Sequence, residues 1–175
     1  MMVNMEVVGV RIEMPSNQPI VLLKEVDGSR FLPIWVGAVE ATAIAFAQQG
    51  MVAQRPLTHD LIANILEAAE LTLTAVQVVQ LKDGIFYAEL QLRTESGSAL
   101  KISARPSDAI AIALRTKSNI LAESDLLDEV GIDIPDRLIG DGDDGAAAGS
   151  GGGSDIELER FREFLDQINP EDFAG

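Results

Sequence analysis

The sequence predicts an α+β protein in which two halves, each a three-stranded β-meander plus helix, form one β-sheet-rich domain with helices packed on the sheets. Three observations lead to this prediction. Three β-rich segments separated by tight turns occur twice along the chain. Helical patterns follow both sets, and two of these helices are introduced by an Arg-Pro pair, in RPLTHDLIANIL and RPSDAIAIALR. With 175 residues, of which 47% are hydrophobic, the chain is long enough for one sizeable core.

The first half combines a small meander with two helices. The turn Asp27-Gly28 separates the second expected strand from the third. The first helix has apolar residues at helical spacing and ends before Gly50, and the second follows Arg55-Pro56, with Thr58 as the expected N-cap. The expected strands are residues 7–14, 19–26 and 30–36, and the expected helices are 38–49 and 58–70.

The second half repeats this pattern. Two Gly-containing turns join three expected strands, and Arg105-Pro106 then ends the meander. Ser107 is the expected N-cap of the following apolar helix. A short strand and a short helix complete the half. The expected strands are residues 71–81, 85–93, 99–104 and 119–122, and the last helix is 124–131.

The chain divides into a folded domain of residues 1–135, a linker of residues 136–154 and a C-terminal segment of residues 155–175. The Gly/Ser/Asp-rich linker has nothing to bury, so we expect it to be flexible. Residues 155–175 have an amphipathic helical pattern with Phe161 and Phe164 on its apolar side. We expect this helix to dock on the folded domain, on a second subunit or on a protein partner.

Composition restricts the classes of function. The chain has no cysteine, which agrees with a reducing compartment, and we expect a cytoplasmic protein without a membrane segment. The formal net charge is −15, and residues 131–175 contribute −9 of it with 3 Lys+Arg against 12 Asp+Glu. No basic stripe is present, so any contact with nucleic acid has to be local. The single histidine excludes a histidine-pair phosphodiesterase and a His-rich zinc site.

The two Arg-Pro segments allow two interpretations. Thr58, Asp60, Ser107 and Asp108 are residue types that cap a helix or favour its N-terminal dipole, so capping alone explains them. The second interpretation is a site where the two helix starts meet. Capping does not explain Arg55 and Arg105, which either pair with the aspartates across the two loops in a structural role or face a phosphate group.

A divalent-metal site is one form that such a meeting could take. Mg²⁺ or Mn²⁺ needs one or two carboxylates plus water, and Glu40, Asp60 and Asp108, together with His59, are the candidate ligands if the helix starts converge. Two roles also remain open for His59. It is either an exposed or cap-stabilising residue or a catalytic or ligand residue.

The strand aromatics and the apolar helices point to buried surface. Trp35, Phe86 and Tyr87 lie in expected strands, where core or interface packing competes with base stacking as their role. The helical segments AVEATAIAFA and AIAIAL have few polar residues even on the side that would face away from the core. An apolar outer side predicts self-association. We expect a homodimer.

Four segments, LPIWVGAVEATAIA, RPLTHDLI, DGIFYAEL and ARPSDAIAIALR, together resemble the bifunctional nuclease (BFN) domain family of bacteria and plants. The resemblance covers about residues 3–135, with the four segments in the family's order. The tail FREFLDQINPEDF is similar to the C-terminal segment of actinobacterial members. One difference is Ser103, since many members have Asp two residues before the Arg-Pro.

The resemblance implies a nuclease that hydrolyses phosphodiester bonds of RNA, DNA or both. Asp60, Asp108 and Glu40 would hold a divalent cation that activates a water molecule, His59 would act as general base or acid, and Arg55 or Arg105 would neutralise the developing charge. The alternative is a non-catalytic regulatory or protein-binding module whose Arg/Asp segments are structural. The candidate residues carried over from the family segments are Glu40, Arg55, Thr58, His59, Asp60, Arg105, Ser107, Asp108 and Arg115, with Thr58, Ser107 and Arg115 expected to bind substrate.

Overall fold

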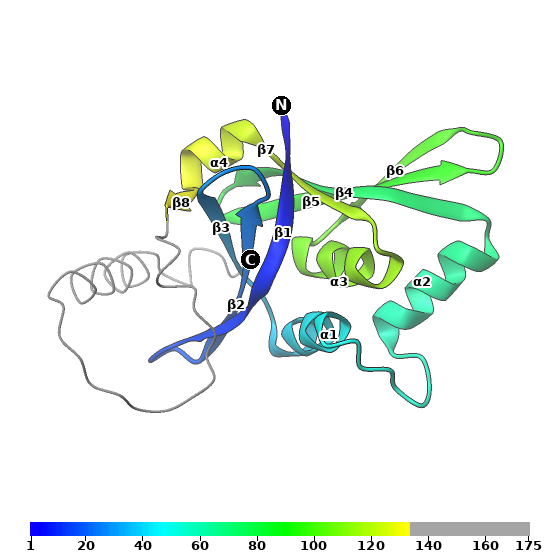
Figure 1. Cartoon of the computed structure of the whole chain (residues 1–175), viewed down its shortest axis with the longest axis horizontal. Coiled ribbons are helices and arrows are strands. Elements are labelled where there is room, and N and C mark those ends of the chain that lie inside the picture. Colours follow the sequence, from blue (N-terminus) through cyan, green and yellow to red (C-terminus); the bar gives the residue numbers. More distant parts are fainter. Residues whose placement is uncertain (134–175) are drawn as a thin grey trace, which may run out of the picture.

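The computed structural model describes residues 1–133 of the chain, which contain eight strands and four helices (Figure 1). The strands are β1 (Met2–Glu13), β2 (Gln18–Glu25), β3 (Arg30–Trp35), β4 (Leu71–Lys82), β5 (Ile85–Thr94), β6 (Ala99–Ala104), β7 (Asn119–Glu123) and β8 (Ile132–Asp133). The helices are α1 (Ala38–Gln48), α2 (Thr58–Ala68), α3 (Pro106–Thr116) and α4 (Ser124–Val130). The predicted α+β fold is confirmed. The linker 136–154 and the helix 155–175 lie outside the described residues and stay predictions.

The two meanders belong to one mixed sheet. Its strand order is β6-β5-β4-β7-β1-β2-β3-β8, with antiparallel neighbours within β1-β2-β3 and within β4-β5-β6. Strand β7 joins the two meanders, since it pairs parallel with β4 and antiparallel with β1. The short strand expected near residues 119–122 is therefore the central connection of the sheet, which local sequence patterns do not reveal.

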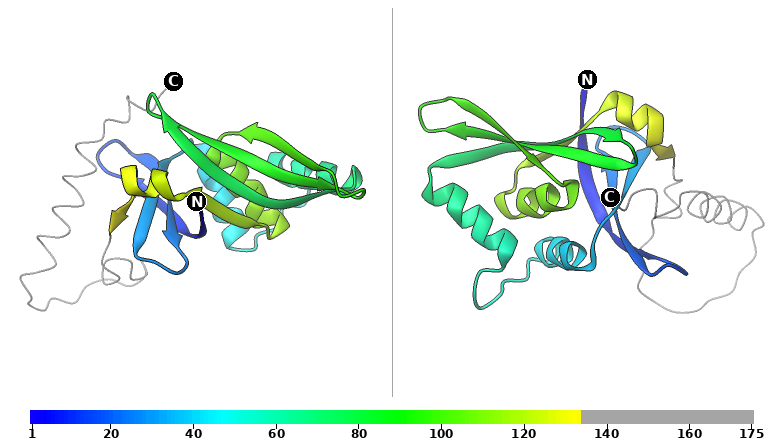
Figure 2. Two further views of the ribbon diagram at one scale, coloured as in Figure 1. Left: turned by 90° about the horizontal axis from the view of Figure 1, so that it is seen from above. Right: turned by 180° about the vertical axis from the view of Figure 1, so that it is seen from behind.

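Helices α1, α2 and α3 form a layer below the second meander in the view of Figure 1, and the two views of Figure 2 agree. Helix α3 lies in the middle of this layer and packs on α1, α2, β4 and β5. Its residues Ala109–Ala113 are all buried. Small alanine side chains let the neighbouring helices approach α3 closely, and buried Ile110 fills the space toward the core.

The burial of α3 removes one reason for the expected homodimer. The segment AIAIAL is apolar on all sides because α3 is enclosed within the subunit. Its composition therefore does not require a second subunit to cover it. Helix α2 differs, because Leu61 and Ile65 remain 51% and 55% exposed while Leu66 is buried.

Both predicted side-chain caps are wrong in detail. The N-cap of α2 is Leu57, whose N–H donates to Oδ2 of Asp60 at 2.9 Å, and Thr58 is the first helical residue. The N-cap of α3 is Arg105, and Pro106 takes the first helical position. Proline has no N–H to leave unsatisfied at that position, and it disfavours helical geometry in the residue before it. The two Arg-Pro segments therefore enter their helices in different registers.

No helix among residues 1–133 combines the length and the apolar character that crossing a membrane requires.

Candidate active site

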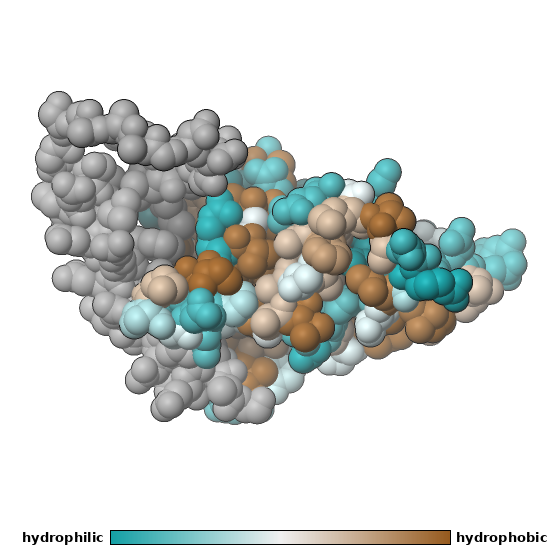
Figure 3. Space-filling view, turned by 90° about the horizontal axis from the view of Figure 1, so that it is seen from below, coloured by the Kyte–Doolittle hydropathy of each residue, from teal (hydrophilic) through white to brown (hydrophobic). Residues whose placement is uncertain are grey.

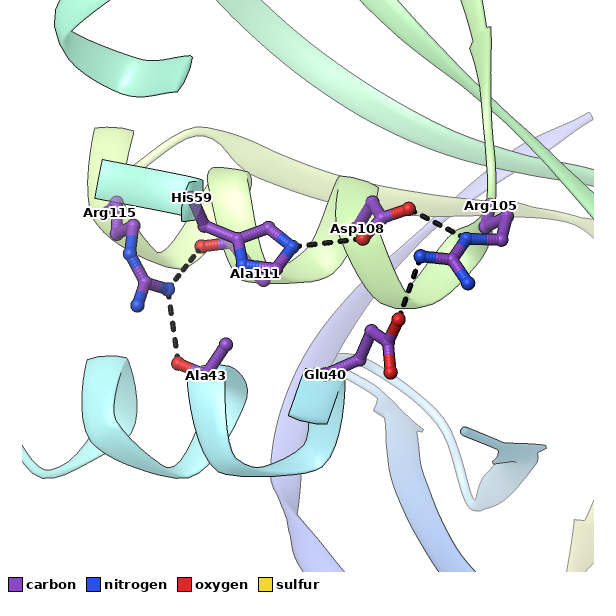
Figure 4. A network of polar contacts seen from close by, with 7 residues as sticks. All are labelled: Glu40, Ala43, His59, Arg105, Asp108, Ala111 and Arg115. Carbon is purple, nitrogen blue, oxygen red and sulfur yellow. Dashed lines mark hydrogen bonds and ion pairs between the residues drawn. The ribbon is translucent and has the colours of Figure 1, made fainter. Parts of the chain in front are cut away.

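A chain of polar contacts joins the starts of α1, α2 and α3 (Figure 4). His59 Nε2 lies 2.9 Å from Oδ1 of Asp108, and Arg105 Nε donates to Oδ2 of the same carboxylate at 2.8 Å. Arg105 Nη2 then donates to Oε1 of Glu40 at 2.8 Å. We call His59, Asp108, Arg105 and Glu40 the helix-start cluster. Segments 49 positions apart in sequence therefore meet through the His59–Asp108 contact.

The register of the helix starts explains how the cluster forms. Because Pro106 begins α3, Arg105 lies at the N-cap and Asp108 one turn later, and the two form an ion pair at spacing i, i+3. His59 is the second residue of α2, and Glu40 lies in the first turn of α1. Each acidic group occupies a first helical turn, where the helix dipole favours negative charge.

The cluster runs from the interior to the surface. The side chain of His59 is 8% exposed, those of Glu40 and Asp108 are 16% and 27% exposed, and that of Arg105 is 66% exposed. The interpretation of His59 as an exposed residue is therefore wrong, since its ring is buried against Asp108. The outward position of Arg105 makes its guanidinium the group that a molecule in solution meets first.

Hydrogen bonds keep the Asp108 carboxylate ionised. Burial acts to raise the pKa of Asp108, but hydrogen bonds from Arg105 and His59 outweigh it and hold the pKa below the ordinary value of 3.8. Hydrogen bonds to Asp108 and Glu40 raise the pKa of Arg105. Both groups are therefore charged at neutral pH and bind each other as an ion pair.

The ionised state of Asp108 fixes the tautomer of a neutral His59. A carboxylate only accepts hydrogen bonds, so Nε2 carries the hydrogen and donates it to Asp108. Nδ1 then has the free lone pair. Nδ1 makes no hydrogen bond to another described residue, and no buried side-chain polar atom of these residues lacks a partner. The second ring nitrogen is therefore not completely buried, and its lone pair could accept a proton.

Asp60 and Arg115 form a separate group beside the cluster. Arg115 Nε donates to Oδ1 of Asp60, and Arg115 Nη1 donates to the carbonyl oxygens of Ala43 at 3.0 Å and Ala111 at 2.9 Å (Figure 4 shows the carbonyl contacts). One guanidinium thus holds α1, α2 and α3 together. The sequence could not predict that the backbone carbonyls of Ala43 and Ala111 accept these hydrogen bonds, because every residue has a carbonyl group.

The structure does not bring all predicted site residues into these two groups. Arg55 and Thr58 are exposed, and Arg55 forms no ion pair within residues 1–133. Ser107 is buried at the second position of α3. Within the same residues, no three His, Cys, Asp or Glu side chains lie close enough together to hold one metal ion.

Acid is expected to remove the stability that Asp60 contributes. The N–H of Leu57 and the guanidinium of Arg115 lower the pKa of Asp60 from 3.8, so its stabilising effect is complete above that value and is lost as the pH falls through the lowered pKa. In urea unfolding, Asp60→Asn should cost about 1 kcal/mol at about pH 6, and the difference from the parent should shrink toward about pH 2. An equal difference at both pH values would contradict this assignment.

The fold and the helix-start cluster define a class of α+β protein whose polar site offers a carboxylate-held imidazole and an outward arginine. Comparison with known proteins gives the family. The model of the family described as "Bifunctional nuclease domain" matches residues 21–135, and the chain belongs to this family.

Two proteins of Mycobacterium tuberculosis are similar to the chain over nearly its whole length. They are named "Uncharacterized protein MT1877" (strain CDC 1551 / Oshkosh) and "Uncharacterized protein Rv1829" (strain ATCC 25618 / H37Rv). Each is 45% identical over 169 residues, which cover 97% of this chain and 96% of the relative. These relatives agree with the predicted actinobacterial type.

Proposed function

We propose that the protein is a nuclease that hydrolyses phosphodiester bonds of RNA, DNA or both at the helix-start cluster. The family membership supports the reaction type. The single observation that carries the assignment is the 2.9 Å contact between His59 Nε2 and Asp108 Oδ1, because it leaves Nδ1 as a proton acceptor. His59 and Arg105 are the proposed catalytic residues, and Asp108 and Glu40 position them.

In the proposed reaction, Nδ1 of His59 takes a proton from a water molecule while the water oxygen forms a bond to phosphorus. The bond between phosphorus and the leaving oxygen breaks, and the imidazolium returns the proton to that oxygen. Negative charge develops on the non-bridging oxygens, where Arg105 contributes a positive charge in a fixed orientation. No redox partner or further co-reactant is required.

The divalent cation expected from the sequence fits the described residues poorly. Asp60 is paired with Arg115, while Asp108 and Glu40 share Arg105, so the cation's place between the two carboxylates is taken by a guanidinium. We therefore include no metal in the reaction above. A requirement for Mg²⁺ or Mn²⁺ stays a prediction, which assays with each metal and with EDTA decide.

Arg105→Ala is expected to reduce cleavage of labelled single-stranded RNA and DNA by roughly 100-fold, because it removes the proposed phosphate contact. The fold should survive, since the side chain is 66% exposed. Arg93→Ala is the matched control, because Arg93 is an exposed arginine on β5 outside the cluster. Equal cleavage by both variants would contradict a catalytic role for Arg105.

A second candidate function is a non-catalytic regulatory or protein-binding module. It is favoured by the ion pairing of Glu40, Asp60 and Asp108, each of which is satisfied within the subunit. In that case the purified chain cleaves neither RNA nor DNA with any metal, and deletion of residues 155–175 abolishes capture of its partner. The expected cytoplasmic location also stays a prediction.

We also propose that the chain forms a homodimer through the outer face of α2. Leu57, Leu61 and Ile65 follow one another at four-residue spacing and are 43%, 51% and 55% exposed. Apolar patches also lie among polar ones on the face in Figure 3. Leu61→Glu with Ile65→Glu should convert a dimer into a monomer in light scattering at micromolar concentration. A parent chain that is already monomeric would rule out the dimer.

A further inference from the structure

A pocket of about 450 Å³ lies where the two meanders meet the starts of α1 and α3. Its walls come from the end of β3, the first residues of β5 and the N-terminal residues of both helices. Trp35, Ile85, Phe86, Arg105 and Ser107 are the lining residues that matter here. A pocket of this volume suits a ligand of the size of a nucleotide.

We propose that this pocket binds one unstacked nucleobase of a single-stranded nucleic acid, while Arg105 holds an adjoining phosphate group. The proposal rests on the nuclease function proposed above and deepens it, because it names the form of the substrate and the residues that select it.

The aromatic walls are the first reason. Trp35 and Phe86 are both partly buried, come from different meanders and line the same pocket. The indole is held in place, since its Nε1 donates to Oε2 of buried Glu13 at 3.0 Å. An aromatic ring that lines a pocket can stack on the flat face of any base, and such stacking contributes about 1–3 kcal/mol per base. The base-stacking role left open for these two residues thus has a place in the fold.

The polar groups are the second reason. Arg105 lines the pocket and uses Nε and Nη2 for Asp108 and Glu40, whereas Nη1 makes no hydrogen bond within residues 1–133. Ser107 is 7% exposed, and its hydroxyl makes no hydrogen bond to another described residue. Because no buried side-chain polar atom of these residues lacks a partner, that hydroxyl remains accessible from the pocket. An apolar pocket with a guanidinium at its edge and a hydroxyl in its wall suits a nucleotide, whose base is flat and whose phosphate is anionic.

The charge of the chain favours a single strand over a duplex. A base inside a duplex is stacked on both faces and has to be extruded before it can enter a pocket, which costs a few kcal/mol. A chain with a net charge of −15 cannot offset that cost by binding many phosphate groups of the duplex. Binding through a single phosphate contact should give a shallow salt dependence, with a slope of log K against log salt of roughly −0.7.

The chain carries its own probe of this pocket, since Trp35 is its single tryptophan. We would titrate the full-length chain, with EDTA present, with a pyrimidine oligonucleotide of about eight residues and record tryptophan fluorescence. The single strand should quench the fluorescence saturably. A duplex of the same sequence, a strand with abasic sugars and a free 5′-mononucleotide should each bind at least roughly 10-fold more weakly.

Two variants test the pocket directly. Phe86→Leu removes one aromatic wall and should weaken binding of the single strand by roughly 5- to 150-fold. Since Phe86 packs partly against the core, a second variant, Ile85→Glu, places a negative charge at a side chain that is 38% exposed and should also weaken binding. Tyr87→Leu is the matched control, because Tyr87 adjoins Phe86 on β5 but does not line the pocket. Circular dichroism of each variant would test whether it is folded.

The outcomes separate this proposal from the nuclease proposal. Binding with quenching but no cleavage supports the pocket and contradicts the nuclease. Cleavage that Phe86→Leu and Ile85→Glu leave unchanged contradicts the pocket and keeps the nuclease. Equal binding of the abasic strand would show that only phosphate is recognised, and equal binding of the mononucleotide would show that the ligand is a free nucleotide; either result overturns the proposal.

Discussion

Replacing Asp108 with Asn is expected to reduce nuclease activity by roughly 10²–10⁴-fold while leaving the fold intact. The neutral amide cannot reproduce the carboxylate, which accepts hydrogen bonds from His59 Nε2 and from Arg105 Nε on its two oxygens. If the amide NH₂ faces His59, Nε2 becomes an acceptor and the ring hydrogen moves to Nδ1. The proton acceptor is then lost, although the imidazole stays in place.

The measurement is the rate of cleavage of a labelled oligonucleotide under single-turnover conditions, across a range of pH values. A purely structural role of Asp108 predicts a lower melting temperature with a normal rate in the folded population. A role in holding His59 predicts a normal melting temperature with a reduced rate and an altered pH profile. Activity within about threefold of the parent at every pH would contradict the proposed function of the His59–Asp108 pair.

Asp125→Asn provides the matched control for this substitution. Asp125 is an exposed aspartate in the first turn of α4, so its replacement removes the same charge as the replacement of Asp108, also from a first helical turn. Loss of its charge should leave cleavage unchanged, because α4 contributes nothing to the helix-start cluster.

The element types could be predicted from the sequence because they depend on local patterns. Alternating apolar residues and Gly-containing turns predict the two meanders, and the spacing of apolar residues predicts α1, α2 and α3. The joining of the meanders by β7 could not be predicted in this way. It depends on pairing across more than 40 residues, between Val76 and Ile120 for example. The three neighbouring apolar residues of β7, Ile120–Ala122, do not specify which strand they will pair with.

The four residues of the helix-start cluster are among the residues predicted from the sequence, but their arrangement could not be predicted, and other predicted residues lie outside the cluster. The repeated Arg-Pro segments draw attention to Asp60 and Asp108, yet their similarity conceals a difference of register. Arg105 therefore becomes the N-cap of α3 and forms an ion pair with Asp108, whereas Arg55 forms no ion pair within residues 1–133. The buried position of His59 also depends on the packing of α2 against α3, which only the folded chain defines.

Replacing Arg115 with Ala is expected to lower the free energy of unfolding by about 2–4 kcal/mol, which corresponds to a fall in melting temperature of about 5–15 °C. The side chain is 10% exposed and donates to Asp60, to the Ala43 carbonyl and to the Ala111 carbonyl. Its removal takes away a charge-assisted hydrogen bond and the packing of its buried stem. Lys117→Ala, at an exposed position two residues later, should change the stability by less than about 0.5 kcal/mol.

Arg115 should also affect catalysis without touching the substrate. Its bond to Asp60 holds the first turn of α2 against α1 and α3, and His59 is the residue immediately before Asp60. Without that bond the imidazole is no longer held at 2.9 Å from Asp108, so the rate should fall even at temperatures where the variant is fully folded. Arg115→Lys keeps the charge and most of the stem but lacks the planar fork that reaches two helices, and it should recover stability more than activity. If the alanine variant, assayed well below its melting temperature, cleaves as fast as the parent, then α2 is positioned by its apolar contacts with α3 and β4, and the guanidinium contributes to stability alone.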